Sequence, residues 1–138
     1  MPTAECSCGA LRATVPAHSP AVVACHCRAC QKRSGSPFGV GAYFAEADVV
    51  TVGEARHFAR PTASGGVFDQ WFCPRCGATI WFRASLRPGM IGIPVGAFAD
   101  PDAPPPLRSV WEESAHPWVQ VPASQHFLQS VAQGARHG

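Results

Sequence analysis

The sequence predicts a single domain that is mainly β. Its hydrophobic residues recur with a period of two over short stretches, which is typical of strands. The 13 glycines and 14 prolines interrupt the 138-residue chain too often for many long helices. Charged residues make up only 14% of the chain and hydrophobic residues 46%, which excludes a charge-driven disordered protein. We expect one domain over residues 1–138, built from short antiparallel strands with one or two short helices.

The expected strands follow from the alternating stretches and from the turn residues between them. They cover residues 11–15, 21–24, 40–44, 49–52, 67–72, 78–82, 90–95 and 107–111. A short helix is expected over residues 28–33, within and after a group of cysteines. A second helix is expected near the C-terminus, where Ser124 can cap a segment that carries Phe127, Leu128 and Val131. The tail from about residue 133 is expected to fray.

Charge and hydropathy limit the partners and the location. The 11 basic and 9 acidic side chains give a net charge of +2, which is a weak signal for nucleic acid, so nucleic acid is not an expected partner. No apolar run approaches the roughly 18 residues of a membrane span. The first residues lack the pattern of a secretory signal, so we expect a cytoplasmic protein without a membrane segment. The sequence carries no signal for an oligomeric state.

Seven cysteines are the most informative feature of the chain. They form three clusters, which are Cys6 with Cys8, Cys25 with Cys27 and Cys30, and Cys73 with Cys76. The odd number, the close spacing and the start of the chain argue against disulfides. Cys73 and Cys76 resemble a zinc knuckle. Pro74 restricts its turn, and Gly77 permits the positive φ that lets backbone N–H groups approach the sulfurs.

The number of cysteines indicates how they divide between sites. A closed zinc site takes four thiolates, so the knuckle needs a second pair, and Cys6 with Cys8 is the natural complement. The remaining three form a local triplet that can hold a second metal with its fourth position open. An alternative division joins Cys27 and Cys30 to the knuckle, but it leaves three cysteines unexplained. Iron–sulfur clusters are disfavoured because the spacings match neither common pattern.

The triplet predicts a particular chemistry. With a zinc ion, three thiolates carry a net charge near −1, so bound water is activated less than at a site of neutral histidines. An open position among thiolates suits a soft ligand, and a substrate thiolate is the obvious candidate. The triplet therefore favours chemistry between a thiol and a carbonyl over hydrolysis.

Several motifs together resemble one known family. They are C-S-C-G from Cys6, C-H-C-R-A-C-Q-K-R-S-G-S-P-F from Cys25, F-C-P-R-C-G from Phe72, I-P-V-G near Pro94 and H-P-W near Trp118. Over about residues 4–118 the chain resembles the glutathione-dependent formaldehyde-activating enzyme family, which also includes centromere protein V. The resemblance implies a β-tent-like fold with two zinc ions. It implies a structural site at Cys6, Cys8, Cys73 and Cys76, and a catalytic site at Cys25, Cys27 and Cys30.

The resemblance also implies an activity, that of a carbon–sulfur lyase. Glutathione, as co-substrate, adds to a small carbonyl compound such as formaldehyde and gives S-hydroxymethylglutathione. The expected partners are therefore a small-molecule thiol and a carbonyl compound. Two alternatives stay open, which are a non-catalytic binding module stabilised by zinc and a related enzyme that acts on a different thiol adduct.

Four residues that follow the triplet are candidates for substrate binding. Lys32 and Arg33 can hold the carboxylates of glutathione, or they are two solvated helix charges. Ser34 and Ser36 can form a cradle of hydroxyl and backbone N–H groups, or they belong to the turn into the next strand.

Several other residues have expected positions without an expected catalytic role. We expect the side chain of His26 to face away from the metal, because successive residues of an extended segment point in opposite directions. Glu112 and Glu113 can supply a general base, but a solvated pair at a strand end is our expectation. His116 and His126 receive no role, and the 4 tryptophans are expected to lie mostly in the core.

Overall fold

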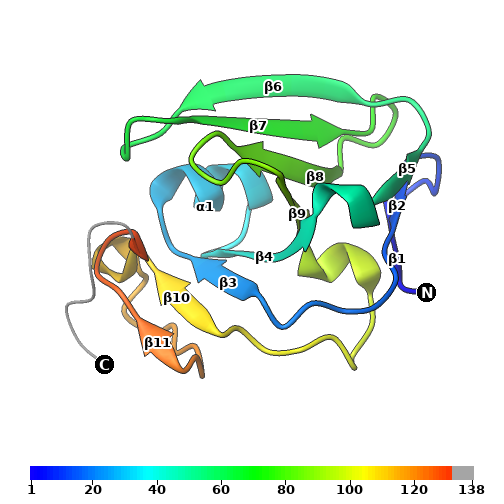
Figure 1. Cartoon of the computed structure of the whole chain (residues 1–138). Coiled ribbons are helices and arrows are strands. Elements are labelled where there is room, and N and C mark those ends of the chain that lie inside the picture. Colours follow the sequence, from blue (N-terminus) through cyan, green and yellow to red (C-terminus); the bar gives the residue numbers. More distant parts are fainter. Residues whose placement is uncertain (132–138) are drawn as a thin grey trace. The chain divides into compact units, whose positions relative to one another are not determined.

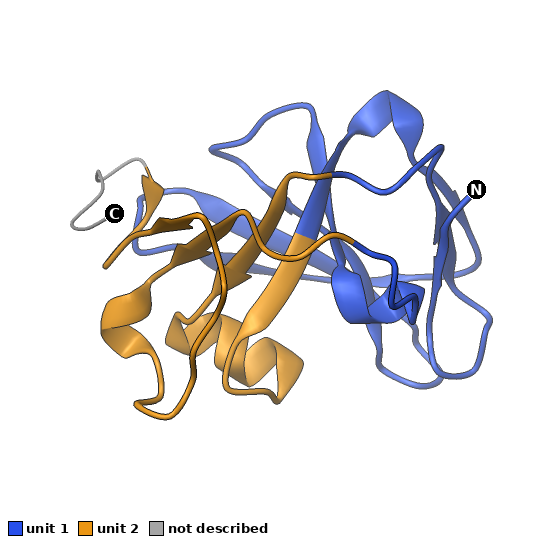
Figure 2. Ribbon diagram, turned by 90° about the horizontal axis from the view of Figure 1, so that it is seen from below, with its two compact units in different colours: residues 1–19, 42–103 blue, residues 20–41, 104–138 orange. Residues whose placement is uncertain are grey.

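A computed structural model of the chain describes residues 1–131 (Figure 1). Two compact units can be separated (Figure 2). Unit 1 comprises residues 1–19 and 42–103, and unit 2 comprises residues 20–41 together with the described residues from 104 onward. Strand β4 (Gly39–Ala45) begins in unit 2 and continues into unit 1. The expectation of one domain over residues 1–138 stays a prediction.

Unit 1 contains two antiparallel arrangements of strands. The first has the order β1-β2-β5 and is formed by β1 (Thr3–Glu5), β2 (Arg12–Thr14) and β5 (Val50–Val52). The second is a meander of β6 (Arg56–Pro61), β7 (Val67–Phe72), β8 (Thr79–Ala84) and β9 (Met90–Pro94). Two 3₁₀ helices, η1 (Glu46–Asp48) and η2 (Val95–Phe98), also belong to this unit.

Alternating side chains give the meander one buried and one half-exposed face. Phe68 and Phe82 are buried and stack with their ring centroids 5.0 Å apart. On the opposite face, Trp71 of β7 is paired with Trp81 of β8, and their rings stack with the centroids 5.7 Å apart. The register shifts just after Trp71, and such an irregularity locally bends a strand. This shift lies directly before the turn that carries two cysteines.

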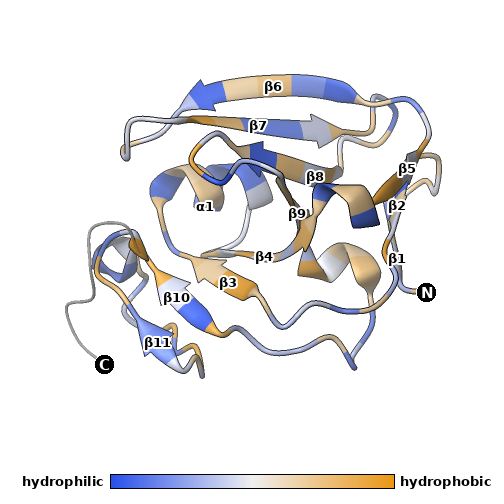
Figure 3. Ribbon diagram, viewed as in Figure 1, coloured by the Kyte–Doolittle hydropathy of each residue, from blue (hydrophilic) through white to orange (hydrophobic). Residues whose placement is uncertain are grey.

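Unit 2 is built around a small parallel arrangement. Strand β10 (Arg108–Val110) lies between β3 (Val22–Cys25) and β11 (Gln125–His126), and both pairings are parallel. Helix α1 (Arg28–Ser34) follows β3, and the 3₁₀ helix η3 (Glu112–Ser114) follows β10. Figure 3 shows β3 as hydrophobic along its length, whereas β6 of unit 1 carries both kinds of residue. Accordingly, the first three residues of β3 are buried.

The mainly β fold class is confirmed, and so are the eight expected strands and the first helix. Strands β1, β6 and β11 were not expected. In unit 2, β10 pairs in parallel with both β3 and β11 instead of antiparallel, because no hairpin joins it to either strand. No helix of the described residues is long and apolar enough to cross a membrane.

The predicted C-terminal helix is wrong. Residues 125–126 form a strand, and residues 127–130 are not helical. The reason is that their backbone groups bond elsewhere in unit 2. The N–H of Phe127 donates to Ser109, and the carbonyls of Phe127 and Gln129 accept from Glu112 and Trp111. Tertiary pairing thus overrides the short helical pattern. The predicted frayed tail from residue 133 lies outside the described residues.

Candidate metal centres and the adjoining pocket

Four cysteines gather in unit 1, and we call them the four-cysteine cluster. They are Cys6 and Cys8, in the segment between β1 and β2, and Cys73 and Cys76, in the turn between β7 and β8. Their sulfur atoms all lie within 4.8 Å of one another. Cys6 and Cys73 are buried, whereas Cys8 and Cys76 are exposed. The cluster therefore has a buried side and a solvent side.

The two turns that carry this cluster each contain a glycine with positive φ. Gly9 has a φ of 79° and Gly77 a φ of 81°, and each directly follows the second cysteine of its turn. The conformation predicted for Gly77 is confirmed. In the same turns, the N–H groups of Leu11 and Arg75 donate to sulfur atoms of the cluster at 3.2 and 3.4 Å. Backbone donors of this kind stabilise thiolates.

The spacing of these sulfur atoms fits a zinc ion. With Zn–S distances of about 2.3 Å, tetrahedral geometry places the sulfurs about 3.8 Å apart. The sulfur of Cys8 lies 3.6 Å from the sulfurs of both Cys6 and Cys73. Backbone N–H groups of Ala78 and Cys8 lower the pKa of Cys76 to about 6, which favours the thiolate that a metal requires. The N–H of Ala10 lowers the pKa of Cys8, but the neighbouring thiols and burial outweigh it and raise this pKa to about 11, so full ionisation of the cluster requires a cation. The cluster can therefore hold a metal as a closed structural site.

The other three cysteines gather in unit 2, where β3 meets α1, and we call them the three-cysteine cluster. Cys25 ends β3, Cys27 is the N-cap of α1, and Cys30 lies within the helix. Their sulfur atoms also lie within 4.8 Å of one another. The N–H of Cys30 donates to the sulfur of Cys27 at 3.3 Å, so this sulfur caps the helix. Among residues 1–131, no fourth cysteine, histidine or carboxylate joins the cluster.

Crowding of the three sulfurs makes this cluster hard to ionise without a cation. Hydrogen bonds to Cys27 and Cys30, together with burial, raise the pKa of Cys25 well above its ordinary value. A hydrogen bond from Cys25 lowers the pKa of Cys30, but the Cys27 thiol and burial raise it by more. A divalent metal ion removes this penalty because it binds the thiolates directly. The donor set thus fits zinc with one position left for another ligand.

Arg33 brings a positive charge to the three-cysteine cluster. A Cβ at Gly39 would lie 2.7 Å from Nη2 of Arg33 and 3.5 Å from Cβ of Cys30, so both side chains pack on this buried glycine. Only the missing side chain leaves room for the guanidinium there. Two influences lower the pKa of Cys30, of which the hydrogen bond from Cys25 is the larger and the charge of Arg33 the smaller. The structure therefore places this predicted residue beside the cluster.

The other predicted substrate residues have different surroundings. Lys32 and Ser36 are exposed. The hydroxyl of Ser34 donates to the carbonyl of Cys30 at 2.8 Å and accepts the N–H of Ser36 at 3.1 Å, so it completes the C-terminal end of α1. The hydroxyl expected in a cradle is thus engaged at the helix end. Substrate binding by these residues stays a prediction.

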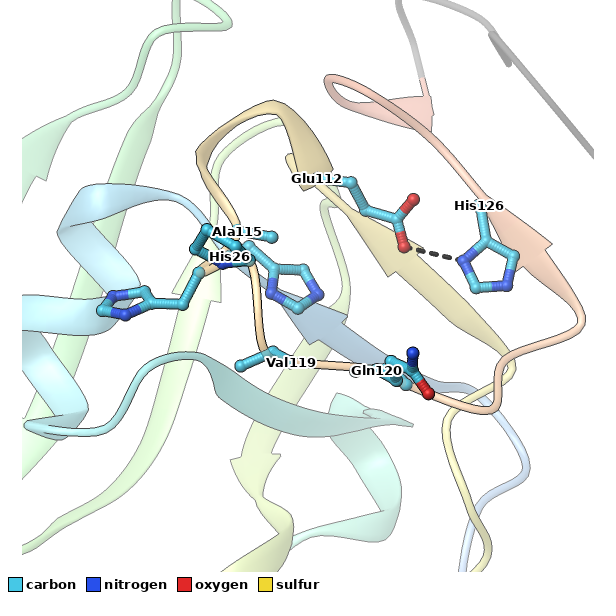
Figure 4. A pocket seen from close by; sticks show the side chains of 9 residues that line it. His26, Glu112, Ala115, Val119, Gln120 and His126 are labelled. Atoms are coloured by element: carbon cyan, nitrogen blue, oxygen red, sulfur yellow. Dashed lines mark hydrogen bonds and ion pairs between the residues drawn. The ribbon is translucent and has the colours of Figure 1, made fainter.

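An open pocket of about 400 Å³ lies in unit 2 (Figure 4). It is lined by His26, Glu112, His126 and most of the segment 115–121. Glu112 accepts a hydrogen bond from Nδ1 of His126 at 2.7 Å, and this bond raises the pKa of His126. Glu112 is therefore a half-buried residue of the pocket, whereas Glu113 is exposed, as expected of a solvated carboxylate. The pocket wall thus carries a carboxylate that is hydrogen-bonded to a histidine.

His26 connects the pocket to the three-cysteine cluster, because it lines the pocket and lies between two of the cysteines in sequence. Its side chain is only 2% exposed and lies outside the metal cluster, in agreement with expectation. Nε2 of His26 bonds to Oγ of Ser109 at 2.9 Å, and the ring packs on Phe38. Burial lowers the pKa of His26, and its buried Nδ1 has no hydrogen-bond partner among residues 1–131. A buried polar atom without a partner costs about 1–3 kcal/mol, so this nitrogen can gain from a hydrogen bond to water or to a pocket ligand.

Sequence reasoning missed Gln31 and Gly39 and misjudged the burial of the tryptophans. Gln31 follows Cys27 by four residues and so lies on the same face of α1, which is the signal that could have identified it. Gly39 carries no comparable signal, because its role depends on Arg33 folding back over it. The expectation that the tryptophans lie mostly in the core is wrong, because Trp118 is 71% exposed and the other three are only half-buried.

The fold and the two clusters define a class, namely mainly β proteins with one closed and one open set of cysteines suited to metal. The sequence matches the family model described as glutathione-dependent formaldehyde-activating enzyme over residues 1–114. This match covers most of the chain, so the protein belongs to that family, and the family predicted from the motifs is confirmed.

One solved structure with a similar fold is that of a Rhodobacter sphaeroides protein. It has a TM-score of 0.55 and 20% sequence identity, and the match covers 69% of this chain and 85% of that chain. At this identity the likeness supports the fold alone. No protein with a curated description matches the chain.

Proposed function

We propose that the protein is a zinc-dependent carbon–sulfur lyase and synthase that adds a thiol such as glutathione to a small carbonyl compound such as formaldehyde. In the forward direction, the sulfur bonds to the carbonyl carbon and the π bond of the carbonyl opens. The proton of the thiol ends on the new hydroxyl group, so no oxidant or reductant is required. The observation that carries the proposal is the three-cysteine cluster, which offers three sulfurs and no fourth ligand among the described residues.

The seven cysteines would form one catalytic and one structural metal site. Cys25, Cys27 and Cys30 would hold the catalytic zinc, and the four-cysteine cluster would hold a structural one. Zinc held by the three thiolates would supply an open, Lewis-acidic position that favours the ionised form of a bound thiol. The four-cysteine cluster leaves no position open and therefore supports the fold only. Seven free cysteines suit a reducing compartment such as the cytoplasm.

Arg33 and the pocket would receive the substrate. A thiolate that joins the three-cysteine cluster adds a negative charge, and the guanidinium beside Cys30 offsets it. The pocket, at about 400 Å³, is far larger than a one-carbon carbonyl needs, since one water molecule occupies about 30 Å³ in the liquid. Its size and its polar groups suit the organic part of a thiol such as glutathione.

The test is exchange NMR on glutathione mixed with labelled formaldehyde, because the uncatalysed addition is itself fast. The samples contain wild-type protein, Cys30→Ser or no protein, and the zinc content of each is measured. We expect faster exchange with the wild type only. Equal rates with wild-type protein and without protein, with two zinc ions in the wild type, would refute this activity, and equal acceleration by wild type and Cys30→Ser would refute its assignment to the three-cysteine cluster.

Titration of thiol into protein loaded with cobalt distinguishes the remaining functions. An open site changes its thiolate-to-cobalt absorption when thiol binds, whereas the site of a non-catalytic binding module does not change. A spectral change without faster formaldehyde exchange indicates an enzyme for a different thiol adduct.

A further inference from the structure

Gln31, in the middle of α1, uses its whole side-chain amide for hydrogen bonds within unit 2. Its Nε2 donates to the carbonyl of His26 at 2.9 Å and to the carbonyl of Ser114 at 3.2 Å. Its Oε1 accepts from Nε2 of His116 at 2.9 Å. Since an amide has two N–H donors and one carbonyl oxygen, each of its polar groups is engaged. Such a residue fixes the relative positions of the three segments that it contacts.

One of these segments is the short stretch that carries two of the three sulfurs. The carbonyl of His26 belongs to the peptide that leads directly into Cys27. The same residue is held at its N–H by the carbonyl of Val110 at 3.0 Å and at Nε2 by Ser109. With Gln31 on the carbonyl, the backbone between Cys25 and Cys27 is fixed from both sides. Rotation of this backbone would move the sulfurs on either side of it.

The other two contacts of Gln31 lie in the wall of the pocket or next to it. His116 lines the pocket, and Ser114 precedes the lining segment 115–121. A single amide therefore bridges the three-cysteine cluster and the pocket wall.

We infer that Gln31 is a positioning residue, which sets the geometry of the three-cysteine metal site and couples it to the pocket wall through His116. The inference rests on the proposed function only in taking the three-cysteine cluster as a metal site. Loss of partners that orient metal ligands lowers metal affinity by about 10- to 100-fold. Because Gln31 acts on the backbone and not on a sulfur, we expect the lower end of this range.

The experiment compares both metal sites of one protein loaded with cobalt. Chelator competition gives the affinity of each site, and the thiolate-to-cobalt absorption reports its geometry. Cys30→Ser identifies the signal of the three-cysteine site. Gln31→Met keeps the length of the side chain without its hydrogen bonds, and Gln31→Glu keeps an acceptor for His116 but loses both N–H donors. Gln129→Met, in the same unit, is the matched control.

We expect both Gln31 variants to weaken the three-cysteine site about tenfold and to shift its absorption. The four-cysteine site and the Gln129→Met control should stay within about twofold of wild type, on the scale of the general scatter of such measurements. If Gln31 had a merely structural role, its replacement would instead lower the metal affinities of both sites together or of neither. Either result, or an unchanged three-cysteine site in Gln31→Met, would overturn the inference.

A double-mutant cycle tests the coupling to the pocket wall. His116→Phe should weaken the three-cysteine site by less than Gln31→Met, and the double variant should be no weaker than Gln31→Met alone. If the two substitutions lowered the metal affinity additively, His116 would not act through the amide of Gln31. If Gln31→Met does not fold, His116→Phe carries the test, and a three-cysteine site unchanged in affinity and absorption overturns the inference. Failure of the wild-type three-cysteine site to bind cobalt would instead refute the proposed function as well.

Discussion

Replacement of Arg33 by glutamine should weaken binding of a thiol to the three-cysteine site. Three thiolates and a divalent zinc ion carry one net negative charge, and a bound substrate thiolate adds another. The guanidinium of Arg33 packs on Gly39 beside Cys30, so it faces this charge at short range. Arg33→Gln removes the positive charge and leaves a polar side chain of similar shape.

The expected size of this effect follows from Coulomb's law. Two unit charges roughly 5 Å apart interact by about 3 kcal/mol at an effective dielectric constant of about 20. Arg33 is half-buried, so solvent screening reduces this to about 1.5 kcal/mol. Each 1.4 kcal/mol corresponds to a tenfold change in a dissociation constant, so thiol binding should weaken about tenfold.

The position of the charge can be tested separately from its presence. In Gly39→Ala the new methyl group overlaps the guanidinium, whose Nη2 lies 2.7 Å from the Cβ position. The flexible arginine can move away, so we expect little loss of stability but weaker thiol binding, in the same direction as Arg33→Gln and smaller. Arg33→Lys keeps a charge, so its affinity for the thiol should lie between the affinities of Gly39→Ala and the wild type.

The assay is titration of glutathione into cobalt-loaded protein, followed by the thiolate-to-cobalt absorption. Arg28→Gln removes a charge from an exposed position of the same helix and is the matched control. Urea unfolding of each variant verifies that the fold is intact. If Arg33→Gln binds glutathione within about twofold of the wild type, while the wild type binds it measurably, the electrostatic argument is wrong.

Three further predictions concern the remaining parts of the structure. Cys76→Ser should lose one bound zinc and several kcal/mol of stability, seen by metal analysis and thermal unfolding, because a closed zinc site contributes folding energy. Gly92→Ala should destabilise the fold by about 1–3 kcal/mol or more in urea unfolding, because its Cβ would overlap the buried ring of Phe82. Glu112→Gln should lower stability more at pH 6 than at pH 9. The raised pKa of His126 contributes stability that is complete below its ordinary value near 6.5 and is lost as the pH rises through the folded value. Equal losses at both pH values would count against this ion pair.

The strands that the sequence revealed are those with a hydrophobic alternation of their own. Strands β7 and β8 are examples, since Phe68 and Phe82 lie on one face and the tryptophans on the other. Strand β6 was missed because its residues are mostly exposed and it ends in Pro61, features that an edge strand tolerates. The two-residue strand β11 exists only because β10 pairs with it. Its local sequence favours a helix that the pairing prevents.

The two cysteine clusters were predictable because ligand counting needs little knowledge of the fold. Two pairs of cysteines and one triplet divide in one economical way, and the sulfur positions agree with it. The pocket was not predictable, because its lining combines His26 with residues more than 80 positions later in the chain. For the same reason, the contact between Glu112 and His126 could not be predicted from the sequence, and a solvated carboxylate was expected instead. Such contacts depend on how β3, β10 and β11 pair.

The two clusters close loops of very different length. The three-cysteine cluster lies within a few consecutive residues, whereas the four-cysteine cluster joins Cys8 to Cys73 across 65 positions. The entropic cost of closing a loop grows with its length, so the short cluster can take up metal before the chain has folded. The long one forms only after two distant turns of unit 1 have met, and a metal held there then acts as a cross-link. Zinc shortage should therefore delay the assembly of unit 1, whereas the three-cysteine cluster can bind metal early or late in folding.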